Sequence, residues 1–123
     1  MPYKVLVIDD SPVMRIMLSE MLTALGHTIV AEAETAAAGL KAFKEKKPDL
    51  VTLDISLPDE NGLSVLEKLR RADPTARVLV VTGNDQRAVE DKAMALKALG
   101  VLHKPFDEVE LAAMIEKVGA KAR

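Results

Sequence analysis

The sequence predicts an α/β domain built on a parallel sheet of five strands. Short apolar runs alternate five times with stretches of helical period, which is the order typical of βαβ units. A chain of 123 residues has the size of one domain and can bury a core of its own. We therefore expect residues 1–123 to form one domain in which helices cover the sheet.

The composition excludes several classes of protein. The chain has no cysteine, so neither a disulfide framework nor a thiolate metal site is possible. Its formal net charge is -2 with both signs spread along the chain, which offers no basic surface for nucleic acid. The apolar runs are too short for a membrane span, and no signal-peptide core follows Met1. These features predict a soluble, cytoplasmic domain that binds neither nucleic acid nor membrane.

The first half of the chain is predicted to contain three strands and two helices. The apolar run that starts at Val5 is followed by Ser11 and Pro12, which can cap a helix and open its first turn. That helix repeats its apolar residues at helical spacing, and Gly26 can end it. The next strand is more polar, which indicates a place near a sheet edge. The predicted strands are Val5–Ile8, Thr28–Ala33 and Leu50–Leu53, with helices over residues 12–25 and 35–46.

The second half is predicted to contain two strands and three helices. The helix after the fourth strand keeps its apolar residues at helical spacing through Leu99, so Gly100 is expected to end it. The predicted strands are Arg77–Thr82 and Val101–Leu102. The helices begin after Gly62, at Asn84 or Asp85, and at Asp107, which has capping-box spacing to Glu110.

Polar side chains stand at the carboxyl ends of four predicted strands. Parallel strands joined by helices all point the same way, and ligands bind at their shared carboxyl edge in open α/β sheets. We therefore expect these side chains to lie close together. They are Asp9 and Asp10 after the first strand, Asp54 after the third, Thr82 in the fourth and Lys104 after the fifth.

These residue types together point to phosphoryl chemistry. Three carboxylates repel one another, and a hard divalent cation such as Mg²⁺ relieves that repulsion while keeping several waters. An ammonium group and a hydroxyl donor beside Mg²⁺ can stabilise a transferring phosphoryl group, and a carboxylate can be its nucleophile. Asp54 ends a strand that is too apolar to be exposed. It is the predicted phosphoacceptor, with Mg²⁺ as the cofactor.

The same residue types also occur in purely structural roles and in other classes of protein. Taken singly, Asp9 could cap a turn and Lys104 could be a solvated side chain, but their coincidence at the strand ends favours a joint function. A phosphohydrolase with an aspartyl-phosphate intermediate uses the same parts, but such enzymes usually carry a second acid where this chain has Ser56. A flavin-binding module would need a hydroxyl- and glycine-rich loop after the first strand, where Asp9 and Asp10 place negative charge instead.

The order and spacing of these residues resemble the receiver domain of two-component response regulators, closest in size to the stand-alone chemotaxis type. The resemblance implies a flavodoxin-like, doubly wound (βα)5 fold with strand order 2-1-3-4-5. It also implies a signalling domain, not an enzyme, that assists its own phosphoryl transfer and autodephosphorylation. The motifs that carry it are Asp9-Asp10, Asp54-Ile-Ser-Leu-Pro58 with Asn61-Gly62, Thr82-Gly83 and Lys104-Pro105-Phe106.

The resemblance assigns roles around the predicted phosphoacceptor. Asp54 would take its phosphoryl group from a phosphohistidine on a sensor histidine kinase or a histidine phosphotransfer protein. Asp10, Asp54 and the backbone carbonyl of Ser56 would bind Mg²⁺ directly, and Asp9 would help through a water molecule. The resemblance thus implies that all four residues belong to the metal site.

The resemblance also implies how the signal leaves the site. Thr82 and Lys104 would contact the phosphoryl oxygens and shift when they arrive, and the bond before Pro105 is expected to be cis. The fourth and fifth helices and the last strand would present the signal to a downstream protein. Val101 stands where the family usually carries an aromatic switch residue, so a relay without that switch is expected. Glu60 replaces a common methionine, and its charge is a candidate influence on docking or phosphate lifetime.

Overall fold

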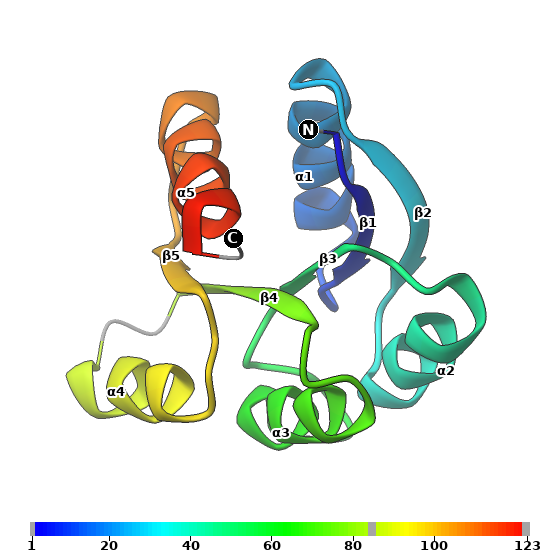
Figure 1. The fold of residues 1–123 in the computed structure, drawn as a ribbon, viewed down its shortest axis with the longest axis vertical. Helices are drawn as coiled ribbons and strands as arrows, with labels where there is room; N and C mark the ends of the chain where they lie inside the picture. The colour runs from blue at the N-terminus through cyan, green and yellow to red at the C-terminus, as the bar shows by residue number, and fades with distance from the viewer. Residues whose placement is uncertain (1, 84–85, 122–123) are drawn as a thin grey trace.

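The fold alternates strand and helix five times, as predicted, in a computed structural model that describes residues 2–83 and 86–121 (Figure 1). None of the helices, as far as they are described, is long and apolar enough to cross a membrane. The strands are β1 (Lys4–Ile8), β2 (Thr28–Ala33), β3 (Leu50–Leu53), β4 (Arg77–Thr82) and β5 (Gly100–His103). The helices are α1 (Pro12–Ala24), α2 (Ala36–Lys46), α3 (Gly62–Ala72), α4 (Arg87–Ala95) and α5 (Glu108–Lys121).

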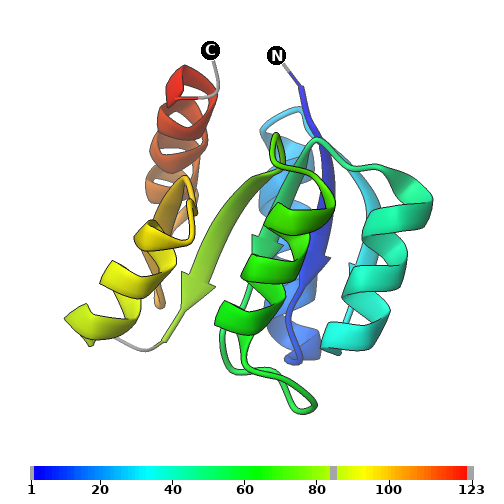
Figure 2. The ribbon, with the colours of Figure 1, turned by 60° about the horizontal axis from the view of Figure 1, so that its bottom comes forward.

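The five strands form one parallel sheet in the order β2-β1-β3-β4-β5, which confirms the doubly wound, flavodoxin-like fold. The polar strand β2 lies at an edge of the sheet, as its composition predicts. The chain leaves β1 toward β2 on one side and returns to β3 on the other. The carboxyl ends of β1 and β3 therefore flank the switch point where ligands bind in such sheets. The strand arrowheads point to this edge in Figure 2.

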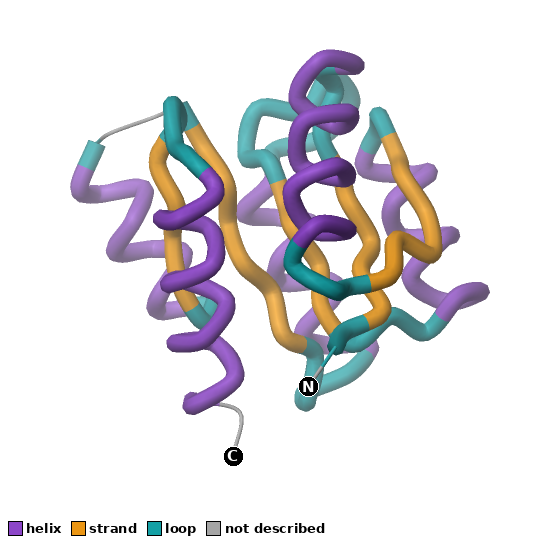
Figure 3. The backbone as a smooth tube through the Cα atoms, turned by 90° about the horizontal axis from the view of Figure 1, so that it is seen from above, coloured by secondary structure: helices purple, strands orange, loops and turns teal. Residues whose placement is uncertain are grey.

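Two helical layers cover the sheet, with α1 and α5 on one face and α2, α3 and α4 on the other (Figures 1 and 3). Strand β1 packs against both helical layers, because successive side chains of a strand point to opposite faces of the sheet. Val5 and Val7 pack in the cluster of α1 and α5, whereas Leu6 and Ile8 pack in the cluster on the other face. All four side chains are buried. Burial on both faces explains why the central strands are continuous apolar runs.

Side-chain hydrogen bonds cap the first turns of α1, α2, α3 and α5. The predicted end of α1 is confirmed, because Gly26 follows the last turn with a positive φ of 94°. The proposed caps of α4, Asn84 or Asp85, lie outside the described residues. The capping bonds run from Met14 N to Ser11 Oγ at 3.2 Å, Ala38 N to Thr35 Oγ1 at 3.1 Å, Leu63 N to Asn61 Oδ1 at 2.8 Å, and Glu110 N to Asp107 Oδ1 at 2.8 Å.

The predicted end of α4 at Gly100 is wrong. The helix ends at Ala95, and Lys97 takes a left-handed φ of 70°. The amide of Ala98 then donates to the carbonyl of Ala93 at 3.0 Å, which is the closing bond of a Schellman motif. Glycine usually occupies the left-handed position of this motif, so a lysine there gives no signal in the sequence. Gly100 is instead the first residue of β5.

Candidate functional site

Asp9 and Asp10 follow directly on β1, at the switch point of the sheet. The Asp9 side chain is 1% exposed, and its Oδ1 accepts the amide of Ser11 at 2.9 Å. Its backbone carbonyl accepts Arg15 Nη1 at 2.6 Å, and Arg15 Nε lies 3.7 Å from Glu32 Oε1 of β2. Asp9 is thus fixed from two sides, while Asp10 is exposed to solvent. No pattern in the sequence indicates the part played by Arg15.

Asp54 follows directly on β3, where the apolar strand ends. The residue is 4% exposed, and its Oδ1 accepts the amide of Ser56 at 3.1 Å. Burial raises the pKa of Asp54, the Ser56 amide and the Lys104 ammonium partly offset that effect, and the charges of Asp9 and Asp10 add to it. A cation bound beside Asp54 would favour its ionised form.

Lys104 joins the ends of three strands. Its Nζ lies 3.0 Å from Asp9 Oδ2 and 3.6 Å from Asp54 Oδ2, and its amide donates to the carbonyl of Thr82 at 2.8 Å. Thr82 is fully buried at the end of β4. The peptide bond from Lys104 to Pro105 is cis, the isomer that the resemblance implies. Residues that are far apart in sequence thus meet at one edge of the sheet.

The three carboxylates are close enough to hold a metal ion. Asp9, Asp10 and Asp54 each offer one oxygen, and these oxygens all lie within 4.8 Å of one another. The Lys104 ammonium supplies one positive charge against three negative ones. A donor set made only of carboxylate oxygens suits a hard divalent cation, and the exposed side of Asp10 leaves room for the waters that Mg²⁺ retains. The residues present therefore fit Mg²⁺.

The loop from Asp54 to Asn61 carries Ser56, which is the third residue predicted to bind the metal directly. The loop folds back on itself, because Ser56 and Asn61 form an antiparallel bridge and the amide of Gly62 donates to the carbonyl of Ile55 at 2.8 Å. Ser56 is exposed, two residues beyond Asp54. Its proposed role as a ligand through the backbone carbonyl stays a prediction.

Glu60 is held along the side of α3. Its carboxylate accepts Ser64 Oγ at 2.6 Å and lies 2.8 Å from Lys68 Nζ. The hydrogen bond from Lys68 is the main cause that lowers the pKa of Glu60, and Ser64 adds to it. The carboxylate of Glu60 is therefore paired with side chains of α3. Its expected influence on docking or phosphate lifetime stays a prediction.

Val101 occupies the position where the resemblance implies that an aromatic side chain is usual. It is 8% exposed, pairs with Val80 in the sheet, and belongs to the same core cluster as Ala93 of α4 and Ala98. A small side chain here is packed in the core on the α4 side. The expected relay without an aromatic switch stays a prediction.

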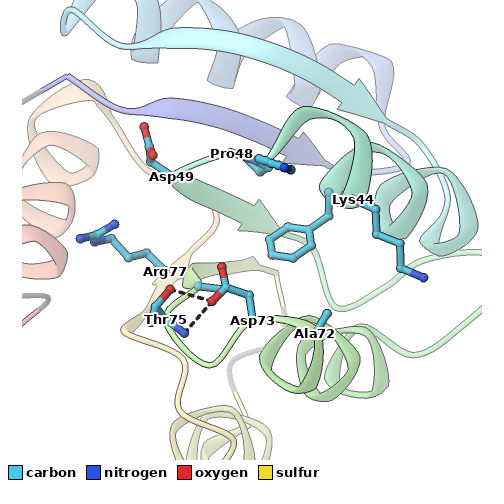
Figure 4. A pocket seen from close by; sticks show the side chains of 10 residues that line it. Lys44, Pro48, Asp49, Ala72, Asp73, Thr75 and Arg77 are labelled. Atoms are coloured by element: carbon cyan, nitrogen blue, oxygen red, sulfur yellow. Dashed lines mark hydrogen bonds between the residues drawn. The ribbon is translucent and has the colours of Figure 1, made fainter.

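A hollow of about 460 Å³ lies at the opposite edge of the sheet, where β3 and β4 begin (Figure 4). The two acidic residues that line it, Asp49 and Asp73, accept hydrogen bonds from nearby groups of the chain. Asp49 Oδ2 accepts the amide of Lys4 at 3.0 Å, and Asp73 Oδ1 accepts both the amide and the hydroxyl of Thr75. None of the predicted site residues lines this hollow. The residues predicted for phosphoryl chemistry lie instead at the carboxyl ends of the strands.

Known proteins share both the sequence pattern and this fold. The model of the response regulator receiver domain matches residues 5–116. The chain is 32% identical over 115 residues to the chemotaxis protein CheY of Thermotoga maritima. The aligned residues cover 94% of this chain and 96% of that protein. A CheY-like receiver domain protein of Methanospirillum hungatei gives a TM-score of 0.89 at 25% identity, over 98% of this chain and 97% of that one.

A further similar structure is that of a complex that contains Mg²⁺ and BeF3. A chain of the CheX-CheY complex with BeF3 and Mg²⁺ from Borrelia burgdorferi gives a TM-score of 0.93 at 25% identity, over 97% of this chain and 90% of that one. The relatives and the family model agree over nearly the whole chain. With its acids and its lysine at the strand ends, this chain belongs to the response regulator receiver domain family of two-component signalling.

Proposed function

We propose that residues 1–123 are a cytoplasmic phospho-acceptor domain and that Asp54 accepts the phosphoryl group. The donor is a phosphohistidine on a sensor histidine kinase or a histidine phosphotransfer protein. The observation that supports this most strongly is the cluster of Asp9, Asp10 and Asp54 with Lys104 Nζ at 3.0 Å from Asp9 and 3.6 Å from Asp54. The family is one of signalling proteins and not of enzymes in the usual sense.

The geometry suggests which oxygen of Asp54 attacks. Oδ1 accepts the amide of Ser56, whereas Oδ2 faces the Lys104 ammonium. Attack by Oδ2 forms a bond to phosphorus while the bond from phosphorus to the donor imidazole nitrogen breaks and leaves its electron pair on that nitrogen. The developing charge on the phosphoryl oxygens then lies beside Lys104, where an ammonium group stabilises it. Thr82, at the end of β4, is the proposed hydroxyl contact.

Mg²⁺ would supply the remaining positive charge at this site. Asp10, Asp54 and the carbonyl of Ser56 would hold the ion directly, and Asp9 would act through a water. When bound, Mg²⁺ neutralises charge on the phosphoryl oxygens and fixes their orientation. Asp9 has a second task, because its Oδ2 holds the Lys104 ammonium in place. The proposed dephosphorylation of the domain would use the same residues.

The signal would leave through the face formed by α4, β5 and α5, toward a protein that is not yet identified. Met94 of α4 is 39% exposed and Val109 of α5 is 76% exposed, so each of these helices offers an apolar side chain to a partner. Two contacts connect β5 with its neighbours next to the site. The amide of Lys104 donates to Thr82, and His103 Nε2 lies 3.4 Å from Glu90 Oε2 of α4. They offer a relay that needs no aromatic residue at position 101.

The Mg²⁺ dependence of phosphorylation tests the proposal. With acetyl phosphate as the donor, the wild-type protein is expected to incorporate phosphate in Mg²⁺ and none in EDTA. Asp10→Asn removes a charged ligand and should raise the Mg²⁺ concentration needed for half-maximal labelling by about tenfold or more. The readout is intact-protein mass spectrometry across a Mg²⁺ titration.

Asp49→Asn is the matched control for this titration. Asp49 lies at the other end of β3, where its carboxylate accepts the amide of Lys4 at 3.0 Å. This variant is expected to need the same Mg²⁺ concentration as the wild type. Labelling that proceeds equally well in EDTA, or an Asp10→Asn titration identical to that of Asp49→Asn, would contradict the proposed metal site.

A further inference from the structure

The loop that carries Ser56 is tied to a helix that follows another strand. Asp59 Oδ1 accepts the amide of Ala36 at 2.8 Å, and Asp59 Oδ2 accepts the amide of Ala37 at 3.1 Å. These are the first two residues of α2, and the partners are 23 and 22 positions apart in sequence. One carboxylate thus bridges the loop after β3 and the start of the helix after β2.

The two bonds complete the N-terminus of α2. The first amides of a helix have no partner within the helix, so each needs an outside acceptor. Thr35, the N-cap, accepts the amide of Ala38 at 3.1 Å through its side chain, and its backbone carbonyl accepts the amide of Gly39 at 3.0 Å. Asp59 supplies the acceptors for the remaining two amides. An anion also interacts favourably with the positive end of the helix dipole.

Asp59 lies on the same loop as Ser56, so its contact with α2 can affect how firmly the proposed metal ligand is held. Apart from Asp59, the loop is anchored at Asp54, through the Ser56 amide, and at Asn61, which bridges to Ser56 and caps α3. Glu60 also binds α3, through Ser64 and Lys68. Asp59 adds a fixed point on a second helix, between Ser56 and α3. A ligand on a loop holds a metal well only when its surroundings keep it within about 0.5 Å of the required place. Among the described residues, the other side-chain hydrogen bonds of loop residues 55–61 run to the loop's own strand and its own helix, so freeing Asp59 removes the polar tie to α2.

We propose that Asp59 is a positioning residue for the metal site, which it serves by holding the Ser56 segment in place through α2. The inference rests on the proposed function in taking the Ser56 carbonyl as a Mg²⁺ ligand. Asp59 does not touch the ion or the phosphoryl group. Its removal changes the affinity for Mg²⁺ and leaves the transfer step intact once the ion is bound.

Three variants separate positioning from simple stability. Asp59→Ala removes both bonds to α2, and Asp59→Asn keeps one acceptor oxygen but turns its amide group toward the other donor. Thr35→Ala is the matched control, because it removes a capping bond from the same end of α2 without touching the loop. The measurements are the melting temperature in EDTA, the dissociation constant for Mg²⁺ by titration calorimetry, and the rate of labelling by acetyl phosphate.

We expect Asp59→Ala to weaken Mg²⁺ binding by about tenfold and Asp59→Asn to fall between it and the wild type. The labelling rate of Asp59→Ala should be slow at low Mg²⁺ and return to the wild-type rate at saturating Mg²⁺. Thr35→Ala should melt at a lower temperature and bind Mg²⁺ as the wild type does. Equal Mg²⁺ affinities for Asp59→Ala and the wild type, or equal losses in Asp59→Ala and Thr35→Ala, would overturn the proposal.

The Mg²⁺ affinity and the labelling by acetyl phosphate also separate this proposal from the proposed function. A wild-type protein that binds Mg²⁺ but accepts no phosphoryl group would refute the proposed function, and the calorimetric comparison of the variants would still decide the role of Asp59. A wild-type protein that accepts phosphate and binds Mg²⁺ no better than Asp59→Ala would refute the positioning role alone. A wild-type protein that binds no Mg²⁺ would refute both.

Discussion

The Asp54→Asn variant is expected to accept no phosphoryl group under conditions in which the wild-type protein is fully labelled. An amide is not a nucleophile toward phosphorus, and among the described residues no other carboxylate lies in the same place relative to Ser56 and Lys104. The measurement is intact-protein mass spectrometry after treatment with acetyl phosphate and Mg²⁺. Wild-type labelling in the variant would contradict the assignment of Asp54 as nucleophile.

A stability measurement tests whether the loss in Asp54→Asn is caused by unfolding. Burial raises the pKa of Asp54, so its ionised form makes the folded state less stable as pH rises from the usual Asp range through the raised pKa. Asparagine carries no such charge and relieves the repulsion from Asp9 and Asp10. In EDTA at neutral pH the variant is expected to melt several degrees above the wild type. The difference should shrink as the pH falls toward about 4, where the unfolded carboxyl gains its proton.

Gly62→Ala is expected to be strongly destabilised. A Cβ at this position would lie 2.4 Å from Ile55 Cα and 2.6 Å from the Asp54 carbonyl oxygen, which are backbone atoms and cannot rotate away. Alanine favours a helix over glycine by up to about 1 kcal/mol, whereas a backbone clash in a packed site costs roughly 3 kcal/mol or more. The cost of the clash therefore outweighs the helix preference of alanine, and the variant is expected to be less stable than the wild type. We expect the melting temperature to fall by about 10 °C or more.

The displaced atoms belong to Asp54 and Ile55, so Gly62→Ala should also accept phosphate slowly. Gly83→Ala is the control, because a Cβ there meets no atom within 4 Å. That variant is expected to melt close to the wild type. Melting temperatures from circular dichroism, measured side by side in EDTA, decide the question. A Gly62→Ala protein as stable as Gly83→Ala would show that the loop can move away from α3 at little cost.

The strands and their meeting at one edge could be predicted because each depends on a strong local pattern. Strands β2, β3 and β4 begin and end where the sequence predicts, since runs of apolar or β-branched residues are bounded by turn residues. Once the strands are parallel, their carboxyl ends must share an edge, and the grouping of Asp9, Asp10, Asp54 and Lys104 follows.

The remaining features could not be predicted because they depend on contacts between distant segments or on an unusual backbone conformation. Lys97 ends α4 in a conformation that glycine usually provides, and the sequence signal pointed instead to Gly100. Asp59 caps a helix more than twenty positions before it, and Arg15 binds a backbone carbonyl that no side-chain pattern reveals. For Asp59 and Arg15 the partner is a backbone group, which carries no residue identity for a pattern to detect.

The position of the phosphoryl group in the wild-type protein decides whether Asp54 is the phosphoacceptor. After reaction with acetyl phosphate and Mg²⁺, the protein is digested and its peptides are sequenced by mass spectrometry. We predict a single phosphoryl group on Asp54, lost on treatment with hydroxylamine as expected for an acyl phosphate. A stable phosphoryl group on the neighbouring Ser56, or on any other residue in place of Asp54, would contradict this assignment.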